Sequence, residues 1–315
     1  MALSRRQFVS TSVAASALGR RPDVPVADSI DQPTAVHHRY AAVGGRQIFY
    51  REAGPRDAPV VVLLHGFPTS SHMYRFLLPA LADRYRVIAP DYVGYGASDA
   101  PPVDEFSYTF ESMTSVMTDF LGEVGVDRFS LYVQDFGAPI GLRIAARHPG
   151  RVAAIISQNG NAYREGIGPQ LLPTLTGPLP TDDELRQTIS PEFTRAQYLT
   201  GVPDPTLVSP DNWELDQALL NRPGNDLIQF AMLRDYRNNL PVYPEIQRYF
   251  RASQVPLLAV WGGGDPIFLP AGAWAFRRDL PEAEVHVLDT GHFALETHLG
   301  TIVRYMRTFL QRVHG

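Results

Sequence analysis

Short apolar runs of five or six residues alternate with longer stretches of helical periodicity along most of the chain. The runs are rich in Val, Ile and Leu, and their length is typical of strands buried on both faces of a sheet. They cover residues 60–64, 86–90, 129–133, 152–157, 256–261 and 284–288. Strands that alternate with helices predict an α/β fold, with a mostly parallel central sheet and helices on both of its faces.

Other local signals extend this expected core. Residues 40–52 are expected to form a hairpin that turns at Gly44-Gly45, because glycine accepts the backbone angles of a tight turn. Helical patterns cover residues 108–124, 139–148 and 292–313. These segments place a hairpin before the first buried strand and helices between or after the later ones.

The alternation stops between residues 161 and 254. This stretch holds 11 of the chain's 27 prolines and shows no clear strand pattern. We interpret it as a mostly helical cap, inserted over the carboxyl edge of the sheet, where sheets of this kind bind ligands. Residues 37–160 and 255–315 would then form the core.

Composition excludes several kinds of chemistry. The chain has 28 basic and 33 acidic residues, a net charge of −5 and no basic stripe, which argues against a nucleic-acid partner. It contains neither cysteine nor lysine, so thiolate metal sites, cysteine nucleophiles, lysine Schiff bases and phosphate-binding lysines are excluded. The nine histidines show no H-E-x-x-H spacing. We therefore expect no metal and no cofactor.

Residues 1–36 are interpreted as an export signal followed by a linker. Residues 4–8 (SRRQF) resemble a twin-arginine signal, and residues 15–17 (ASA) suit a signal peptidase. The mature chain is expected to begin near Leu18 and to be periplasmic or extracellular, with a cytoplasmic location as the alternative if the start is misassigned. The stretch is too short and too polar to span a membrane, so no integral membrane protein is expected.

Three segments, each just after a predicted strand, carry the candidate chemistry: 133–138 (VQDFGA), 261–266 (WGGGDP) and 289–293 (DTGHF). Taken singly, Asp135 could cap a helix, Asp265 could belong to an ordinary turn, and His292 could be structural. Taken together they place a nucleophile, an acid and a histidine in that order at the carboxyl ends of strands. This order predicts a catalytic triad.

A fourth segment, residues 65–68 (HGFP), follows the first buried strand and suits an oxyanion loop. The backbone N–H groups of Phe67 and Phe136 would stabilise a developing oxyanion there. His65, at the start of this loop, is a candidate substrate-binding residue.

In these four segments the sequence resembles the α/β-hydrolase superfamily, specifically its branch of epoxide hydrolases and haloalkane dehalogenases. Residues 91–98 (DYVGYGAS) look like that branch's loop after the next strand, and the resemblance extends over roughly residues 40–313. It implies the α/β-hydrolase fold with a cap. It also implies that Asp135 is the nucleophile, that His292 is the base and that Asp265 orients it.

An aspartate nucleophile limits the kinds of bond that the enzyme is expected to open. Attack of a carboxylate on an acyl carbon would give an anhydride that easily reverts, whereas attack on a saturated carbon gives a stable ester. Asp135 therefore indicates that a carbon–oxygen or carbon–halogen bond is opened at an alkyl carbon. Water activated by His292 would then hydrolyse the ester.

The leaving group is expected to be an epoxide oxygen, which needs a proton donor such as tyrosine. Tyr236, in residues 234–239 (RDYRNN), looks like the ring-opening tyrosine that epoxide hydrolases carry late in the cap. Tyr198 or Tyr163 is the candidate for a second one. We expect a small apolar epoxide and water as the partners.

Other activities remain as alternatives. Dehalogenases usually have Trp after the nucleophile and many have Asn in the oxyanion loop, where this chain has Phe136 and Phe67. Fluoroacetate dehalogenases carry Arg after the nucleophile, which Phe136 does not match. Trp213 in the cap keeps alkyl halide hydrolysis open. The alternative from another class of function is a small-molecule receptor with this fold. Hydrolysis of an ester or lactone is a weaker enzyme alternative, because the chain has no serine at the position of the nucleophile.

Overall fold

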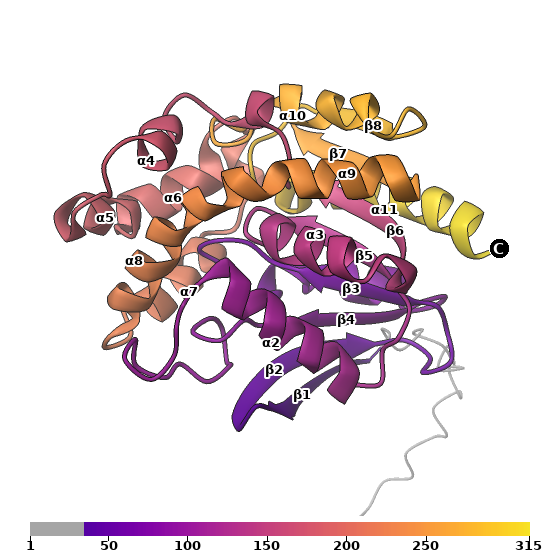
Figure 1. The fold of residues 1–315 in the computed structure, drawn as a ribbon, viewed down its shortest axis with the longest axis horizontal. Helices are drawn as coiled ribbons and strands as arrows, with labels where there is room; N and C mark the ends of the chain where they lie inside the picture. The colour runs from indigo at the N-terminus through magenta and orange to yellow at the C-terminus, as the bar shows by residue number, and fades with distance from the viewer. Residues whose placement is uncertain (1–34) are drawn as a thin grey trace, which may run out of the picture. The chain divides into compact units, whose positions relative to one another are not determined.

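The computed structural model describes residues 35–315, and within them a single eight-stranded sheet has the order β1-β2-β4-β3-β5-β6-β7-β8 (Figure 1). Its strands are β1 Val36–Val43, β2 Arg46–Ala53, β3 Val60–Leu64, β4 Arg86–Pro90, β5 Phe129–Gln134, β6 Val152–Gln158, β7 Leu257–Gly262 and β8 Glu284–Leu288. Strands β3 to β8 pair in parallel. The predicted parallel sheet is thus confirmed.

The first two strands form the predicted hairpin at one edge of the sheet. Gly44 and Gly45 make its turn with φ angles of 54° and 79°, in the left-handed region that glycine enters without strain. Strand β1 begins at Val36, earlier than the expected start at residue 40, and β2 pairs antiparallel with β4. The hairpin therefore extends the parallel sheet beyond β4.

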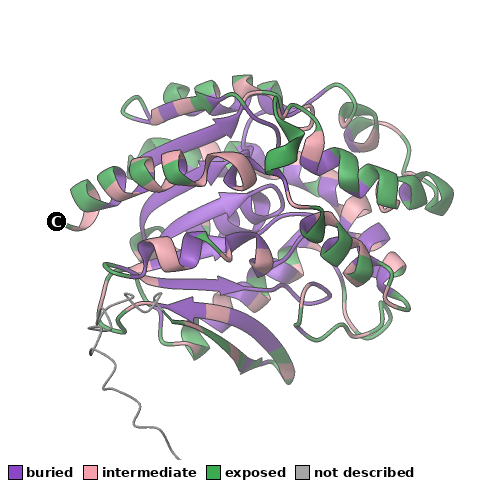
Figure 2. Cartoon of the chain, turned by 180° about the vertical axis from the view of Figure 1, so that it is seen from behind, coloured by how far each residue is buried: buried purple, intermediate pink, exposed green. Residues whose placement is uncertain are grey.

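Helices cover both faces of the sheet. Helices α2 Phe110–Glu123, α3 Gly137–Arg147, α9 Tyr243–Ser253 and α10 Pro270–Ala275 pack on one face, and α1 Leu77–Leu81 and α11 Ala294–His314 pack on the other. Figure 1 shows α2, α3 and α9 crossing in front of the strands. Alternate strand residues supply the two cores: Val62 and Leu64 face one, and Val61 and Leu63 the other. In Figure 2 the central strands are accordingly buried.

The cap consists of short helices without a strand between residues 164 and 242: α4 Leu172–Thr176, α5 Asp182–Thr188, α6 Pro191–Leu199, α7 Pro210–Leu220 and α8 Asn225–Asp235. Short 3-10 turns complete the described chain: η1 Ser71–Tyr74, η2 Pro149–Arg151, η3 Arg164–Gly166, η4 Pro205–Leu207, η5 Tyr236–Val242 and η6 Phe276–Arg278. The cap is tied to the core by the Asp235 carboxylate, which accepts a hydrogen bond from the Phe110 N–H at 2.7 Å, at the first residue of α2.

The structure corrects the end of the expected insertion, residues 161–254. Helix α9 lies inside that range, but it packs directly against α3 of the core, with Tyr243, Ile246 and Phe250 buried. Periodicity indicates that a segment is helical and has one apolar side. It does not indicate whether that side packs on the sheet or on other cap helices.

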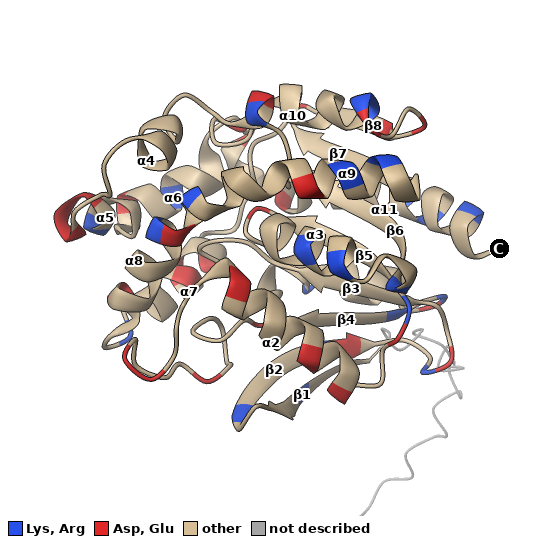
Figure 3. Ribbon diagram, in the orientation of Figure 1, with Lys and Arg blue, Asp and Glu red and all other residues tan. Residues whose placement is uncertain are grey.

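The expected export signal falls almost entirely on residues 1–34, outside the described part of the chain. Among residues 35–315, none of the helices has the length and apolar character needed to cross a bilayer. Figure 3 marks acidic residues along α2 and basic residues along α3. Glu111 on α2 pairs with Arg147 on α3.

Candidate active site

Asp135 occupies a strained turn between β5 and α3. Its φ angle is 48°, a left-handed value that costs a non-glycine residue free energy and that is common at functional sites. The turn needs small neighbours, because a Cβ on Gly137 would lie 2.1 Å from the Leu64 carbonyl oxygen and a Cβ on Gly66 2.4 Å from the Asp135 Cβ. Asp135 is not the N-cap of α3, since that position is Phe136 without a side-chain cap.

Backbone donors surround the Asp135 carboxylate. The Phe67 N–H donates to Oδ1 at 2.7 Å. The neighbouring Phe136 N–H acts on the same carboxyl group and lowers its pKa. The two N–H groups expected to form an oxyanion hole are therefore brought to the same side chain. They can stabilise negative charge both on the resting carboxylate and on an ester carbonyl under attack.

His292 and Asp265 form a buried pair next to this carboxylate. Nδ1 of His292 lies 2.7 Å from Oδ2 of Asp265, and both side chains are at most 1% exposed. The Asn159 amide donates to the same Oδ2 at 2.7 Å, and the Ile267 N–H donates to Oδ1 at 2.7 Å. Because Asp265 is held by these three donors, it fixes the ring orientation of His292 and leaves Nε2 for chemistry.

Sequence reasoning missed Asn159. It follows β6 directly and has a φ angle of 46°, another strained value for a non-glycine residue. Its position at a strand end next to β5 is the signal that could have identified it, since the other site residues also follow strands.

Asp135 and His292 influence each other's pKa through their charges. Burial raises the pKa of the Asp135 carboxyl, although His292 and the N–H groups of Phe67 and Phe136 oppose this by stabilising the charge. Burial by itself lowers the pKa of His292, but the carboxylates of Asp265 and Asp135 outweigh it and the pKa lies above its ordinary value. When Asp135 becomes an ester it loses its charge, which favours the neutral, basic form of His292.

The pKa of His292 is expected to fall in the Asp135→Asn variant, because one of the charges that raise it is removed. NMR titration of the imidazole measures the decrease, which is expected because a neighbouring negative charge no longer favours the imidazolium form. The control is Asp91→Asn, which removes another buried carboxyl that does not act on His292. An unchanged or higher pKa in Asp135→Asn would contradict this coupling.

Tyr236, the predicted ring-opening donor, lies next to the strained turn at Asp135, here called the elbow. Its ring packs against that of Phe136 at 5.6 Å between centroids and is 6.4 Å from that of Phe268, which in turn packs 6.0 Å from the His292 ring. Burial, the neighbouring Tyr243 and the charge of Asp135 hold the pKa of Tyr236 well above its ordinary value. The hydroxyl therefore remains a proton donor at neutral pH.

The structure corrects the expected role of His65. Its ring is completely buried between Tyr92 and Tyr95, Nδ1 lies 3.0 Å from the Gly66 carbonyl oxygen, and Nε2 accepts from the Tyr92 N–H at 3.3 Å. Both ring nitrogens are thus used by backbone groups. His65 therefore holds the oxyanion loop through these backbone groups, and its ring is closed off from the surface.

The three remaining cap candidates are not brought to Asp135. The Tyr198 hydroxyl donates to Asp216 on α7 at 2.5 Å, and the Tyr163 hydroxyl donates to Asp279 at 2.8 Å. Trp213 is half-buried and lines an outer groove of about 550 Å³ between α6 and α7. These positions are a correction: each hydroxyl has a carboxylate partner on another element, which no local pattern indicates.

Asp216, the partner of Tyr198, makes the cap sensitive to pH. Burial raises its pKa to about 7, against roughly 3.9 in an unfolded chain. The folded chain therefore binds this proton more tightly, so the contribution of Asp216 to stability is full below about pH 4 and is lost as the pH rises through 7.

Asp216→Asn is expected to reduce the fall in Tm between pH 5 and pH 8 by a few °C, because the side chain no longer ionises. Thermal unfolding at the two pH values measures this effect. Asp211→Asn, an exposed change on the same helix, is the control. Asp211→Asn should show the same fall in Tm as the unaltered protein. If Asp216→Asn shows that full fall as well, the expectation is wrong.

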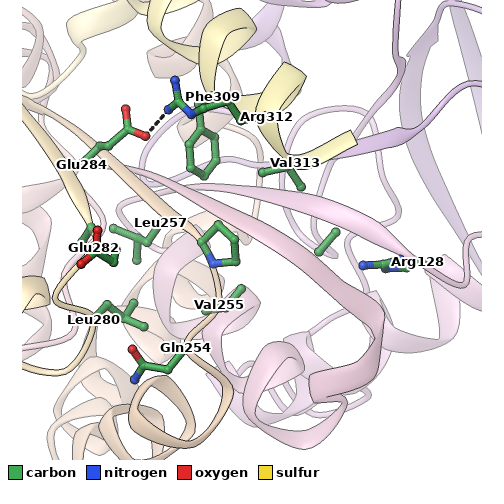
Figure 4. Close-up of a pocket in the computed structure, with 13 residues that line it drawn as sticks. Arg128, Gln254, Val255, Leu257, Leu280, Glu282, Glu284, Phe309, Arg312 and Val313 are labelled. Atoms are coloured by element: carbon green, nitrogen blue, oxygen red, sulfur yellow. Dashed lines mark hydrogen bonds and ion pairs between the residues drawn. The ribbon is translucent and has the colours of Figure 1, made fainter. Parts of the chain in front are cut away.

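A cavity of about 520 Å³ lies at the opposite edge of the sheet. Figure 4 shows residues that line it, among them Leu257 and Glu284, which are the first residues of β7 and β8. Asp135, Asp265 and His292 lie beyond the carboxyl ends of their strands, so this cavity is not the triad site. Within residues 35–315, no group of three His, Asp or Glu side chains is arranged to hold a metal.

Comparison with known proteins identifies the family of this chain. Residues 59–299 match the alpha/beta hydrolase fold family. An uncharacterized hydrolase of Saccharomyces cerevisiae is 38% identical over 273 residues, which cover 84% of this chain and 93% of the yeast protein. A haloalkane dehalogenase of Mycobacterium marinum is 36% identical over 166 residues, about half of each chain (51% and 52%). The ligand-free epoxide hydrolase CorEH has a TM-score of 0.72 at 20% identity, covering 89% of this chain and all (100%) of that one.

Proposed function

Because this chain belongs to the alpha/beta hydrolase fold family, we propose that it hydrolyses an epoxide to a diol through an ester on Asp135. Similarity to a haloalkane dehalogenase over about half of the chain and to the fold of an epoxide hydrolase supports this proposal. The observation that carries the proposal is the Asp135 carboxylate at the strained turn after β5, which accepts from the Phe67 N–H and lies beside a buried His–Asp pair. The position and the negative charge of the Asp135 carboxylate suit attack on a saturated carbon.

In the first step, a carboxylate oxygen of Asp135 forms a bond to an epoxide carbon while the carbon–oxygen bond of the ring breaks. The ring oxygen leaves as an alkoxide and takes the proton of the Tyr236 hydroxyl. Tyr236 suits this donor role because its ring lies against that of Phe136, next to the nucleophile. The products of the step are an ester on Asp135 and a tyrosinate.

In the second step, His292 removes a proton from water, which attacks the ester carbonyl. The resulting oxyanion is stabilised by the N–H groups of Phe67 and Phe136, each contributing about 3 kcal/mol. The diol oxygen leaves with the proton from His292, and the regenerated carboxylic acid returns a proton to the tyrosinate. The sum of the steps is addition of one water to one epoxide.

Alkyl halide hydrolysis is the second candidate, favoured by the dehalogenase relatives, of which the Mycobacterium marinum protein is similar over about half of this chain. The same two-step use of Asp135 would serve it. A halide needs N–H donors rather than a proton, and Trp213, the candidate for that task, lies in a groove on the cap. The position of Tyr236 favours the epoxide.

Tyr236→Phe is expected to slow epoxide opening by about a hundredfold, because the leaving alkoxide loses its proton donor. Halide release from an alkyl halide should change much less, since a halide leaves without a proton. Diol formation and halide release over a small panel of substrates measure both rates. Equal loss on the two classes would contradict the donor role, and faster turnover of halides by the unaltered protein would favour the second candidate.

We also propose that residues 1–36 direct export. The twin-arginine pattern at residues 4–8 supports this proposal. Cell fractionation and sequencing of the amino terminus test it: a mature chain outside the cytoplasm that begins near Leu18 is expected. A full-length chain retained in the cytoplasm would contradict it.

A further inference from the structure

Gln134, the last residue of β5, contacts the catalytic base directly. Its side chain is completely buried, and its amide nitrogen Nε2 lies 2.7 Å from Nε2 of His292. The other ring nitrogen of His292 is engaged by Asp265 at 2.7 Å. Gln134 therefore occupies the one ring nitrogen that remains to accept a proton from water.

In the described part of the chain, the side-chain amide of Gln134 has one hydrogen-bond partner, the His292 ring. A Cβ on Gly66 would lie 2.2 Å from Oε1 of Gln134, so the glycine of the oxyanion loop makes room for the side chain. Among the described residues, Oε1 has no hydrogen-bond partner. The orientation of the amide is thus determined by its bond to His292 alone.

The direction of this hydrogen bond depends on the charge of the ring. An amide nitrogen only donates, so its bond to Nε2 forms when that nitrogen carries a lone pair. In the neutral ring Nδ1–H donates to Asp265 and Nε2 is free to accept. The bond therefore favours neutral imidazole over imidazolium.

The charged groups around His292 act in the opposite direction. Asp265, after β7, and Asp135, after β5, are the titratable groups that face the ring, and both favour its charged form. The rings of Phe268 and Phe293 flank it at 6.0 and 4.9 Å between centroids and carry no charge. Gln134 is the polar side chain that offsets the two carboxylates.

We propose that Gln134 is a positioning residue that keeps His292 a neutral base, with Nε2 held toward Asp135 until water replaces the amide. Its role in ester hydrolysis rests on the proposed function. The hydrogen bond itself belongs to the resting protein and is testable without a substrate.

The first test is an NMR titration of His292 in the Gln134→Met variant, which keeps a similar volume and removes the donor. The pKa of His292 is expected to rise by about one unit, a tenfold change in its protonation ratio. An amide turned so that Oε1 accepted from Nε2–H would favour imidazolium, and the same variant would then lower the pKa. A lower or unchanged pKa overturns the proposal.

Gln158→Met is the matched control. Gln158 is an equally buried amide on the adjacent strand β6, but it accepts from the Tyr132 hydroxyl and donates to the backbone carbonyl of His292, not to its ring. No shift in the pKa of His292 is expected there. A shift equal to that of Gln134→Met would show a general effect of losing a buried amide and would overturn the specific role.

The second test follows the two chemical steps as a function of pH. In Gln134→Met, ester hydrolysis is expected to be about tenfold slower at pH 7 and to recover by pH 9, with ester formation unchanged. A loss that is equal at every pH would mean a purely structural role and would overturn the proposal. If no substrate reacts, the proposed function fails, whereas the NMR result still decides the role of Gln134.

Gln134→Glu covers the case in which Gln134→Met does not fold. It keeps the shape of the side chain and adds a carboxylate next to Nε2. The pKa of His292 should then rise by more than about one unit, since a third negative charge favours imidazolium. No rise in this variant would show that the side chain does not act on His292, and would overturn the proposal.

Discussion

Asp135→Asn is expected to lower epoxide turnover by at least about a thousandfold. The neutral amide has no charged oxygen with which to open the ring, and the N–H groups of Phe67 and Phe136 still occupy the same positions. Diol formation from a small aromatic epoxide, measured to the background rate, checks this result. Turnover within tenfold of the unaltered protein would place the nucleophile elsewhere.

This variant is expected to fold at least as stably as the unaltered protein at pH 7. Because burial raises the pKa of Asp135, the folded state does not favour its charge, and replacing it with a neutral side chain of the same shape removes that cost. Thermal unfolding of the variant distinguishes a lost nucleophile from a lost fold.

Asp91→Asn provides the matched control for turnover. Asp91 is a buried carboxylate that follows β4, and its oxygens accept from the N–H groups of Ser71 and Ala97 at 2.7 and 2.8 Å. It contacts no member of the triad through these bonds. We expect a loss of stability in this variant, with turnover per folded molecule within about tenfold of the unaltered protein.

His292→Gln is expected to accumulate the ester on Asp135. Ring opening requires Asp135 and Tyr236 but no base, whereas hydrolysis of the ester requires His292, so the second step should slow by about a thousandfold or more. Mass spectrometry after a quench should show the chain heavier by one substrate, on the peptide that contains Asp135.

The control is His286→Gln on β8. The ring of His286 stacks on that of Tyr305 at 3.8 Å between centroids, and the same substitution there should leave no ester. In the unaltered protein, multiple turnovers in water labelled with heavy oxygen should label Asp135 itself. An unlabelled Asp135, or an adduct on another peptide, would contradict the two-step mechanism.

Much of the fold and the triad could be predicted because both depend on local patterns. The apolar runs at residues 60–64 and 129–133 form β3 and β5, and a parallel sheet brings their carboxyl ends to one edge. Asp135, Asp265 and His292 follow such ends, so finding the strands was enough to bring the three together. Tyr236 was proposed from its resemblance to a known cap segment, whereas its place next to Asp135 comes from the tertiary structure.

The sequence could not predict a side chain's role where its hydrogen-bond partner comes from a distant segment of the chain. Tyr198 bonds Asp216 and Tyr163 bonds Asp279, so neither hydroxyl is directed at Asp135. Gln134 and Asn159 were missed for the same reason, since each becomes part of the site only through His292 or Asp265, more than a hundred residues later (158 and 106).

The amino-acid sequence by itself determined the strands, the order of nucleophile, acid and histidine, and the edge of the sheet at which they meet. These follow from side-chain periodicity and from residues that adjoin in the chain. The tertiary structure alone decided which buried polar groups pair, which tyrosine lies over the elbow, and that α9 packs with the core. The physical reason is that a buried hydrogen bond depends on the position of both partners, and the packing of elements far apart in the chain sets those positions.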